Sequence, residues 1–197
     1  MKVVEFTLNE DSEDFGVFAI SLVEQPAIEE NFKYFSKDGS PSKFATIDKD
    51  KRIVMGAVMI PDIQILRVDE NGDQFKCFFT KETIKRVSEL YMQQSKHKNA
   101  TLEHMRVVNG VTTIETWIVE DSKRDKTQVY GLEYPVGTWV ACMKIENEDV
   151  WQNYIKEGVV KGFSIEGYFE ESPVKMSELD ILEQIKKIIK EDENKTL

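Results

Sequence analysis

The stretch that most constrains the fold is residues 161–169, which read Lys-Gly-Phe-Ser-Ile-Glu-Gly-Tyr-Phe. The pattern predicts a buried strand with a serine at its centre and a glycine on each side. Side chains alternate between the two faces of a strand, so Ser164 and Glu166 share the more polar face. Glycine inside a strand marks a bulge or the close approach of another backbone or a ligand. A serine on such a stiff element suits a nucleophile, and it is equally typical of a structural serine beside a kink.

Composition narrows the classes of protein to consider. The 197 residues fit one domain with room for an appendage. The net charge is −10 and no basic stripe occurs, which argues against direct binding of nucleic acid. No apolar run approaches the roughly 20 residues of a membrane span. Cys77 and Cys142 lie in apolar runs typical of reduced core thiols in a cytosolic protein, and no Cys/His spacing indicates zinc, so we expect no metal or cofactor.

The order of elements predicts an α+β, mainly β fold, a small closed or partly open β-barrel flanked by helices. Residues 63–69 and 74–79 flank a Glu-Asn-Gly-Asp turn and predict a hairpin. Thr80 and Asn147 are the expected N-caps of two helices. Residues 36–51 are rich in Ser, Asp, Gly, Pro and Lys and predict an exposed loop.

The domain is expected to cover residues 1–173, because Pro173 closes the serine strand. Residues 174–197 form a tail. Within it, apolar residues recur on one stripe and predict an amphipathic helix.

A hairpin is expected where Asn109-Gly110 separates residues 100–108 from residues 111–120, both rich in strand-forming residues. Asn-Gly is the strongest signal for a two-residue turn, and such a turn fixes the register of the strands. In this register Val108 lies opposite Val111, and each step away from the turn adds one further pair. His104 is therefore expected opposite Glu115. Directly opposed residues have Cβ atoms about 4.5–5.5 Å apart, so this imidazole and carboxylate could form a hydrogen bond.

These residues supply the parts of a serine hydrolase site. A serine nucleophile needs a base to take its proton, and the base needs an orienting group. Ser164, His104 and Glu115 are the candidates for these three roles, and Glu166 competes with Glu115 because it shares a face with Ser164. The alternative is an ordinary polar pair of His104 and Glu115 on a solvent-exposed face of the sheet.

Several motifs, in this order along the chain, resemble the XkdF-type prohead proteases of tailed phages. They are Asn99-Ala-Thr-Leu-Glu-His104, Glu115-Thr-Trp-Ile-Val-Glu-Asp121, Tyr130-Gly-Leu, Val136-Gly-Thr-Trp139, and Trp151 leading to Gly162-Phe-Ser-Ile-Glu-Gly167. The N-terminal run Ile20-Ser-Leu-Val-Glu-Gln-Pro26 is also similar to that family. The resemblance covers roughly residues 14–170.

The resemblance implies relatives among the phage prohead proteases and the herpesvirus assemblins. It implies a small β-barrel ringed by helices and a serine endopeptidase with Ser164 as nucleophile and His104 as base. Many prohead proteases carry an acid ahead of a Val-Ser-Val-Val-like run that follows the serine strand. Here the similar run precedes the histidine, as in a circularly permuted barrel, and Ala19 occupies the position of the acid.

The function implied is capsid maturation. The enzyme would cut the scaffold protein, extensions of the major capsid protein and itself inside the assembling prohead, in the cytoplasm of the bacterial host. The rival hypothesis is a scaffold or internal head protein with little or no activity on a protease fold, and its C-terminal stripe suits self-association. A third hypothesis is a β-barrel that binds carbohydrate or peptide, in which Ser164 and His104 only bind.

Overall fold

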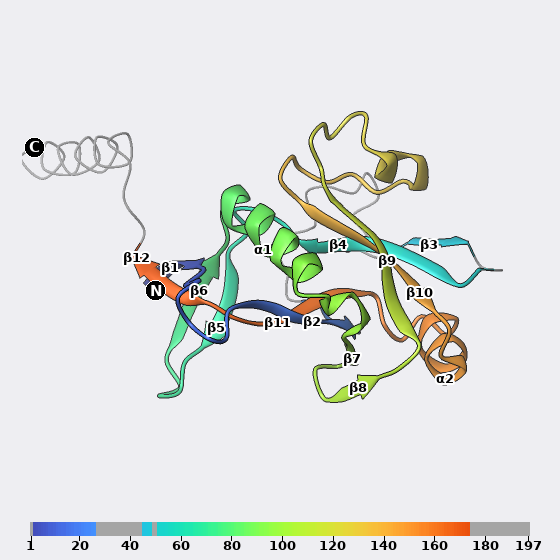
Figure 1. Ribbon diagram of the computed structural model, residues 1–197, viewed down its shortest axis with the longest axis horizontal. Coiled ribbons are helices and arrows are strands. Elements are labelled where there is room, and N and C mark those ends of the chain that lie inside the picture. The colour runs from blue at the N-terminus through green and yellow to red at the C-terminus, as the bar shows by residue number, and fades with distance from the viewer. Residues whose placement is uncertain (1, 27–44, 49–50, 174–197) are drawn as a thin grey trace, which may run out of the picture.

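Three four-stranded sheets make up the described part of the chain, which in this computed structural model is residues 2–26, 45–48 and 51–173. The sheet that holds both described ends, here the terminal sheet, has the order β12-β1-β6-β5 (Figure 1). The central sheet has the order β3-β4-β10-β9, and the serine sheet has the order β11-β2-β7-β8. The central sheet is antiparallel, whereas the other two each contain one parallel pair.

The strands have the following bounds. The terminal sheet contains β1 (Lys2–Thr7), β5 (Ile65–Val68), β6 (Gln74–Phe78) and β12 (Glu170–Pro173). The central sheet contains β3 (Ala45–Asp48), β4 (Ile53–Met59), β9 (Val111–Ile118) and β10 (Trp139–Ile145). The serine sheet contains β2 (Gly16–Val23), β7 (Ala100–Leu102), β8 (Arg106–Val108) and β11 (Gly162–Tyr168).

Two α-helices in the described part of the chain accompany the sheets. Helix α1 (Lys81–Gln93) packs against β2, β9 and β10, and α2 (Glu148–Val150) continues as the π-helical turn η4 (Trp151–Ile155). Two 3-10 helices, η2 (Lys96–Lys98) and η3 (Lys126–Tyr130), lie in the connections.

Both predicted caps are confirmed: Thr80 Oγ1 accepts from the Thr83 amide, and Asn147 Oδ1 accepts from the Val150 amide. No helix of the described ranges is long and apolar enough to cross a membrane.

The mainly β class and the hairpin of β5 and β6 are confirmed. The closed barrel is not found, because all three sheets of the described residues are open at their edges. The strands expected to pair through Asn109-Gly110 lie in different sheets, so this connection passes from one sheet to another instead of continuing a ring. Residues 45–48 of the predicted loop form β3. The rest of residues 36–50 and the predicted C-terminal helix lie outside the described residues.

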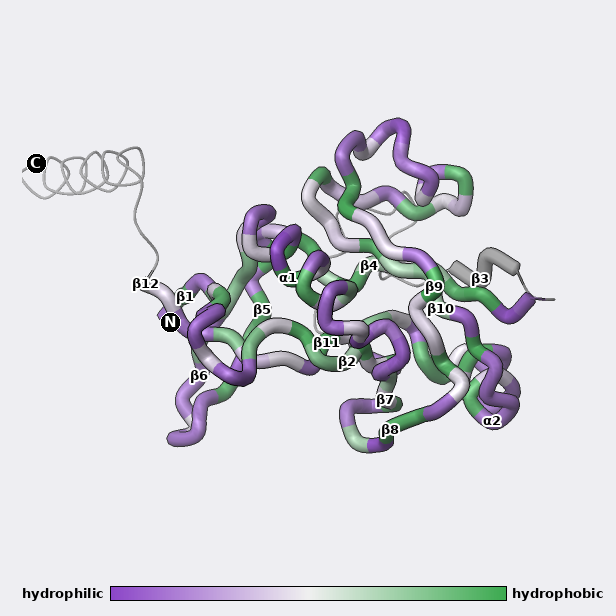
Figure 2. The backbone as a smooth tube through the Cα atoms, in the orientation of Figure 1, coloured by the Kyte–Doolittle hydropathy of each residue, from purple (hydrophilic) through white to green (hydrophobic). Residues whose placement is uncertain are grey.

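One apolar core joins the three sheets and α1. In Figure 2 the hydrophobic colour follows β4, whereas the hairpin loop between β5 and β6 is hydrophilic. Strand β2 is buried along nearly its whole length, because it pairs on both edges and α1 packs against it. Strands covered on both faces have near-continuous apolar sequences, which explains the run Val-Phe-Ala-Ile-Ser-Leu-Val.

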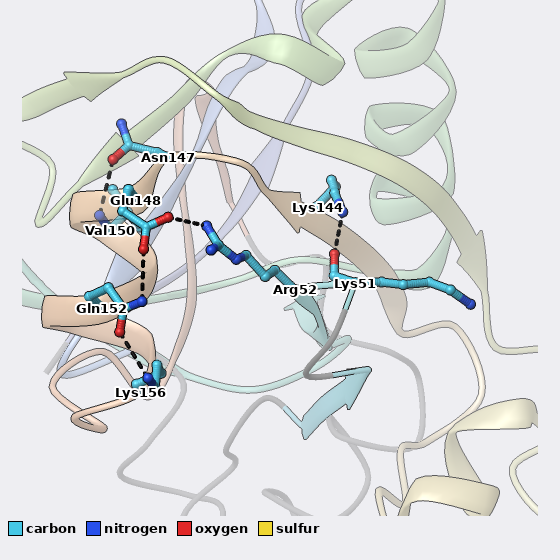
Figure 3. Close-up of polar contacts among 8 residues, drawn as sticks. All are labelled: Lys51, Arg52, Lys144, Asn147, Glu148, Val150, Gln152 and Lys156. Carbon is cyan, nitrogen blue, oxygen red and sulfur yellow. Dashed lines mark hydrogen bonds and ion pairs between the residues drawn. The ribbon is translucent and has the colours of Figure 1, made fainter.

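Helix α2 is tied to the central sheet by a chain of polar contacts on the surface. Figure 3 shows the Glu148 carboxylate between Arg52, which lies just ahead of β4, and Gln152 of the next helical turn. Arg52 Nη1 donates to Glu148 at 2.6 Å, and Gln152 Nε2 donates to it at 2.7 Å. The guanidinium of Arg52 also lies over the ring of Trp151, 5.9 Å from its centroid. These contacts fix the direction in which the chain leaves β10 toward the serine strand.

A buried hydroxyl pair between α1 and β9 provides a test of this packing. Tyr91 Oη and Thr113 Oγ1 are 3.1 Å apart and both residues are buried. We predict that Tyr91→Phe or Thr113→Val alone lowers the free energy of unfolding by about 1–3 kcal/mol, because each leaves one buried polar group unpaired. The double variant should lose less than the sum of the two. Urea unfolding of the four proteins gives the coupling, and strict additivity would show that the two hydroxyls are not partners.

The same tyrosine predicts a pH dependence. Burial raises the pKa of Tyr91 to about 12, whereas the unfolded chain titrates near its ordinary value of 10.0. The contribution of neutral Tyr91 is therefore fully present below pH 10 and is lost as the pH rises toward 12. We expect the free energy of unfolding to fall over this range more steeply in the wild type than in Tyr91→Phe.

Candidate active site

A row of hydroxyl side chains crosses the serine sheet. Strand β11 runs antiparallel to β2, and Ser164 lies directly opposite Ser21. Strand β2 runs parallel to β7, and Ser21 lies beside Thr101. Residues paired across a ladder project to the same face, so these three side chains share one face of the sheet. They are 8%, 0% and 7% exposed for Ser164, Ser21 and Thr101, so the row is almost fully buried.

His104 reaches this face from the turn between β7 and β8. Its Nδ1 lies 3.3 Å from Oε1 of Glu166, the residue two positions beyond Ser164 on the same face of β11. The same Oε1 accepts a hydrogen bond from Thr101 Oγ1. A proton on Nδ1 therefore points to the carboxylate. The Nε2 lone pair is then left to accept a proton from a hydroxyl group.

Ser164 and His104 are joined through β2. The His104 amide donates to Ser21 Oγ at 3.0 Å, and Ser21 is the ladder partner of Ser164. Paired Cα atoms in an antiparallel ladder are about 4.5–5.5 Å apart, so the two sites are close. Among the described residues no hydrogen bond joins Ser164 Oγ to the imidazole directly. Catalytic hydrogen bonds are often long without substrate and tighten when it binds.

The predicted pairing of His104 with Glu115 is wrong. Glu115 lies on β9 opposite Cys142 of β10, and its carboxylate forms an ion pair with Lys126. Burial raises the pKa of Cys142 to about 11, so its side chain stays a thiol beside this acid. Of the two acids considered from the sequence, it is Glu166 that lies at the histidine.

The pairing failed because Asn109-Gly110 is not a hairpin turn. The Gly110 carbonyl accepts hydrogen bonds from the amides of Glu146 and Asn147, at 2.7 and 3.0 Å. The Asn147 side chain also donates to the Asn109 carbonyl at 2.9 Å. The dipeptide is thus held against the start of α2, where the chain passes from the serine sheet to the central sheet.

The actual hairpin turn lies within the predicted strand of residues 100–108. The chain reverses at Glu103 and His104, so that Leu102 pairs with Arg106. Arg106 Nη2 donates to Asp149 of α2 at 3.0 Å. Hydrogen bonds from Asn153 and then from Arg106 hold the pKa of Asp149 below its ordinary value. The exposed ion pair adds little to stability, but it connects the histidine hairpin to α2.

A narrow apolar cavity reaches β11 at Ser164. It is lined by residues 58–60, by Ile65 and Arg67 of β5, by Phe79, and by residues 163–165. Two wider hollows, of about 540 and about 400 Å³, lie elsewhere, and neither is lined by Ser164 or His104. The lining of the narrow cavity includes Ser164 but neither His104 nor Glu166, so the site is defined by the side-chain contacts and not by a cavity. No group of three or more possible metal ligands occurs among the described residues.

Sequence reasoning missed Ser21 and Thr101. Both depend on the parallel pairing of β2 with β7, which are separated by nearly eighty residues of chain. No local pattern reports such a pairing. The signal available was the single serine within the otherwise apolar run of β2, because a buried hydroxyl needs a hydrogen-bond partner.

The comparisons with known proteins place the chain in a family. Neither the curated proteins nor the solved structures gave a match. A family model described as "Putative phage serine protease XkdF" matches residues 42–172, about two thirds of the chain. The matched range includes His104, Ser164 and Glu166, whereas β2 lies ahead of it. The chain belongs to this family of phage serine proteases.

Proposed function

We propose that the chain is a serine endopeptidase in which Ser164 is the nucleophile, His104 the general base and Glu166 the acid that orients the base. The observation that carries the proposal is the 3.3 Å contact between His104 Nδ1 and Glu166 Oε1, on the strand face that also holds Ser164. A serine hydrolase needs this order of groups, recognised by geometry and not by position in the chain.

In the proposed reaction, Ser164 Oγ attacks the carbonyl carbon of a peptide bond and its proton passes to His104 Nε2. Glu166 holds the proton on Nδ1 and stabilises the imidazolium that forms. The imidazolium then gives its proton to the departing amine, which leaves an acyl ester on Ser164. Water, deprotonated by the same histidine, hydrolyses this ester and restores the serine.

The place of Glu166 in the sheet supports its assignment as the acid. Ala19 occupies the position where many prohead proteases carry an acid, and Ala19 is the direct ladder partner of Glu166. The two side chains project to one face, and the alanine methyl group leaves space beside it. The Glu166 carboxylate, from the neighbouring strand, can therefore occupy the space beside Ala19 and take the role of the acid. This supports Glu166 over Glu115 as the third residue.

Capsid maturation is the proposed biological role, and membership of a phage protease family supports it. The proposed substrates are the scaffold protein, extensions of the major capsid protein and the enzyme itself, inside the prohead in the bacterial host. The antiparallel pairing of β1 with β12 supports a permuted fold, because adjacent ends are what a circular permutation requires. Self-association through residues 174–197 remains part of the proposal.

The first test is chemical labelling of the serine. The full chain is treated with a fluorescent fluorophosphonate, which bonds to an activated serine with loss of fluoride, and the adduct is mapped by mass spectrometry. We expect one adduct, on Ser164, and none in Ser164→Ala, together with loss of cleavage of co-expressed scaffold and capsid proteins. Unlabelled wild-type protein, or unchanged processing by Ser164→Ala, would favour the structural role without catalysis.

The second test separates the two acids. Glu166→Gln should slow labelling and cleavage by about 10²- to 10⁴-fold, because the amide cannot hold the imidazolium. Glu115→Gln is the matched control: it also removes one carboxylate from a strand, but its partner is Lys126. It should stay within a few-fold of wild type. The opposite ranking would restore Glu115 as the third residue.

A further inference from the structure

The turn that carries His104 has an unfavourable backbone conformation. Glu103 and His104 are its two central residues, with φ of 52° and 56°, and the Met105 amide closes it on the Leu102 carbonyl at 3.1 Å. β-Turns with positive φ at both central positions favour Gly, Asn or Asp there. A left-handed backbone costs other residues about 1–2 kcal/mol each. A glutamate followed by a histidine therefore needs support from its surroundings.

That support comes from β2 and the residue after it. The Glu103 amide donates to the Leu22 carbonyl at 3.0 Å, which extends the parallel ladder into the turn. The Glu103 carboxylate accepts from the Glu24 amide at 2.7 Å. The His104 amide donates to Ser21 Oγ at 3.0 Å. Strained backbone persists where neighbours over-determine it, and such positions cluster at functional sites.

Among the groups that support the turn, Ser21 provides the only side chain from β2, and this side chain is fully buried, at 0% exposed. It also stands between the two proposed catalytic groups, because its backbone pairs with Ser164 while its hydroxyl holds the amide of His104. A hydroxyl without solvent access cannot itself attack a protein substrate. The hydrogen bond from the His104 amide suits Ser21 to another task, which is to hold the histidine turn at a fixed position relative to Ser164.

We propose that Ser21 is a positioning residue of the protease. It anchors the left-handed backbone of His104 and thereby sets the position of the imidazole relative to Ser164. The inference rests on the proposed function of Ser164, His104 and Glu166. It adds a residue that lies outside the matched range of the family model and whose hydroxyl bonds to the backbone of His104 and not to a reacting atom.

The test is the Ser21→Ala variant of the full chain, with the fluorophosphonate as probe. We expect the labelling rate at saturating probe to fall by about 10- to 100-fold, because a displacement of about 1 Å in a catalytic group can cost 10²-fold. The probe concentration that gives half of the maximal rate should change by less than about threefold, because Ser21 does not contact the probe. Amide hydrogen exchange at His104 should become faster, which reports the lost anchor independently of activity.

Thr113→Val is the matched control. It removes another buried hydroxyl that makes one hydrogen bond, to Tyr91 at 3.1 Å, on a strand outside the serine sheet. It should lower the midpoint of urea unfolding as much as Ser21→Ala does, or more, yet leave the labelling rate unchanged. This comparison separates a loss of position from a general loss of stability.

The outcomes are distinguishable. If Ser21→Ala labels as fast as Thr113→Val while Ser164→Ala does not label, the positioning role is wrong and the protease proposal stands. If His104 exchange is unchanged in Ser21→Ala, the anchor is wrong. If Ser164→Ala still cleaves or labels, both proposals fail together. The inference is supported if Ser21→Ala is labelled slowly, its His104 amide exchanges faster than in the wild type, and Thr113→Val is labelled at the wild-type rate.

Discussion

The pairing of β2 on both edges is the constraint on which the site depends. Its antiparallel ladder with β11 places Ser164, and its parallel ladder with β7 places Thr101 and the histidine turn. These segments are far apart in the chain and have no short connection that would bring them together. A shift of this strand by one residue would turn Ser21 away from the face that holds Ser164 and Thr101. The register of β2 therefore sets how both sides of the proposed site lie relative to each other.

Around this strand, the polar groups of the site support one another. Glu166 accepts hydrogen bonds from both Thr101 and His104, and Ser21 accepts one from the His104 amide. A carboxylate in a partly buried position with two donors is held in one orientation, and an unpaired one would be costly. The histidine is thus fixed at its ring by one strand and at its backbone by another. Pre-organisation of this kind reduces the reorganisation needed during catalysis.

The sequence predicted what depends on local pattern. The strand around Ser164, the caps at Thr80 and Asn147, and the hairpin at residues 70–73 arise from contacts within a few residues, and all three are found. The choice of Ser164 and His104 came from residue chemistry and from resemblance. Glu166 was available because it shares a strand face with Ser164, although the turn-derived register favoured Glu115.

What could not be predicted depends on long-range pairing. Asn109-Gly110 has the strongest local hairpin signal of the chain. Its carbonyl groups instead accept hydrogen bonds from the chain at the start of α2, so it connects two sheets and does not form a hairpin turn. The true turn contains Glu103 and His104, which no turn preference would select, because its support comes from residues of β2 and Glu24 some eighty positions earlier. A strained turn that carries the proposed catalytic histidine is a place where local and tertiary preferences are expected to disagree.

The most direct test of the central claim is a crystal structure of the full chain with a phosphonate bonded to Ser164. We expect His104 Nε2 to lie within about 2.6–3.2 Å of the Ser164 oxygen or of the phosphonate oxygen beside it, with Nδ1 still in contact with Glu166. An imidazole turned away to solvent, with Glu166 held by Thr101 alone, would contradict the account.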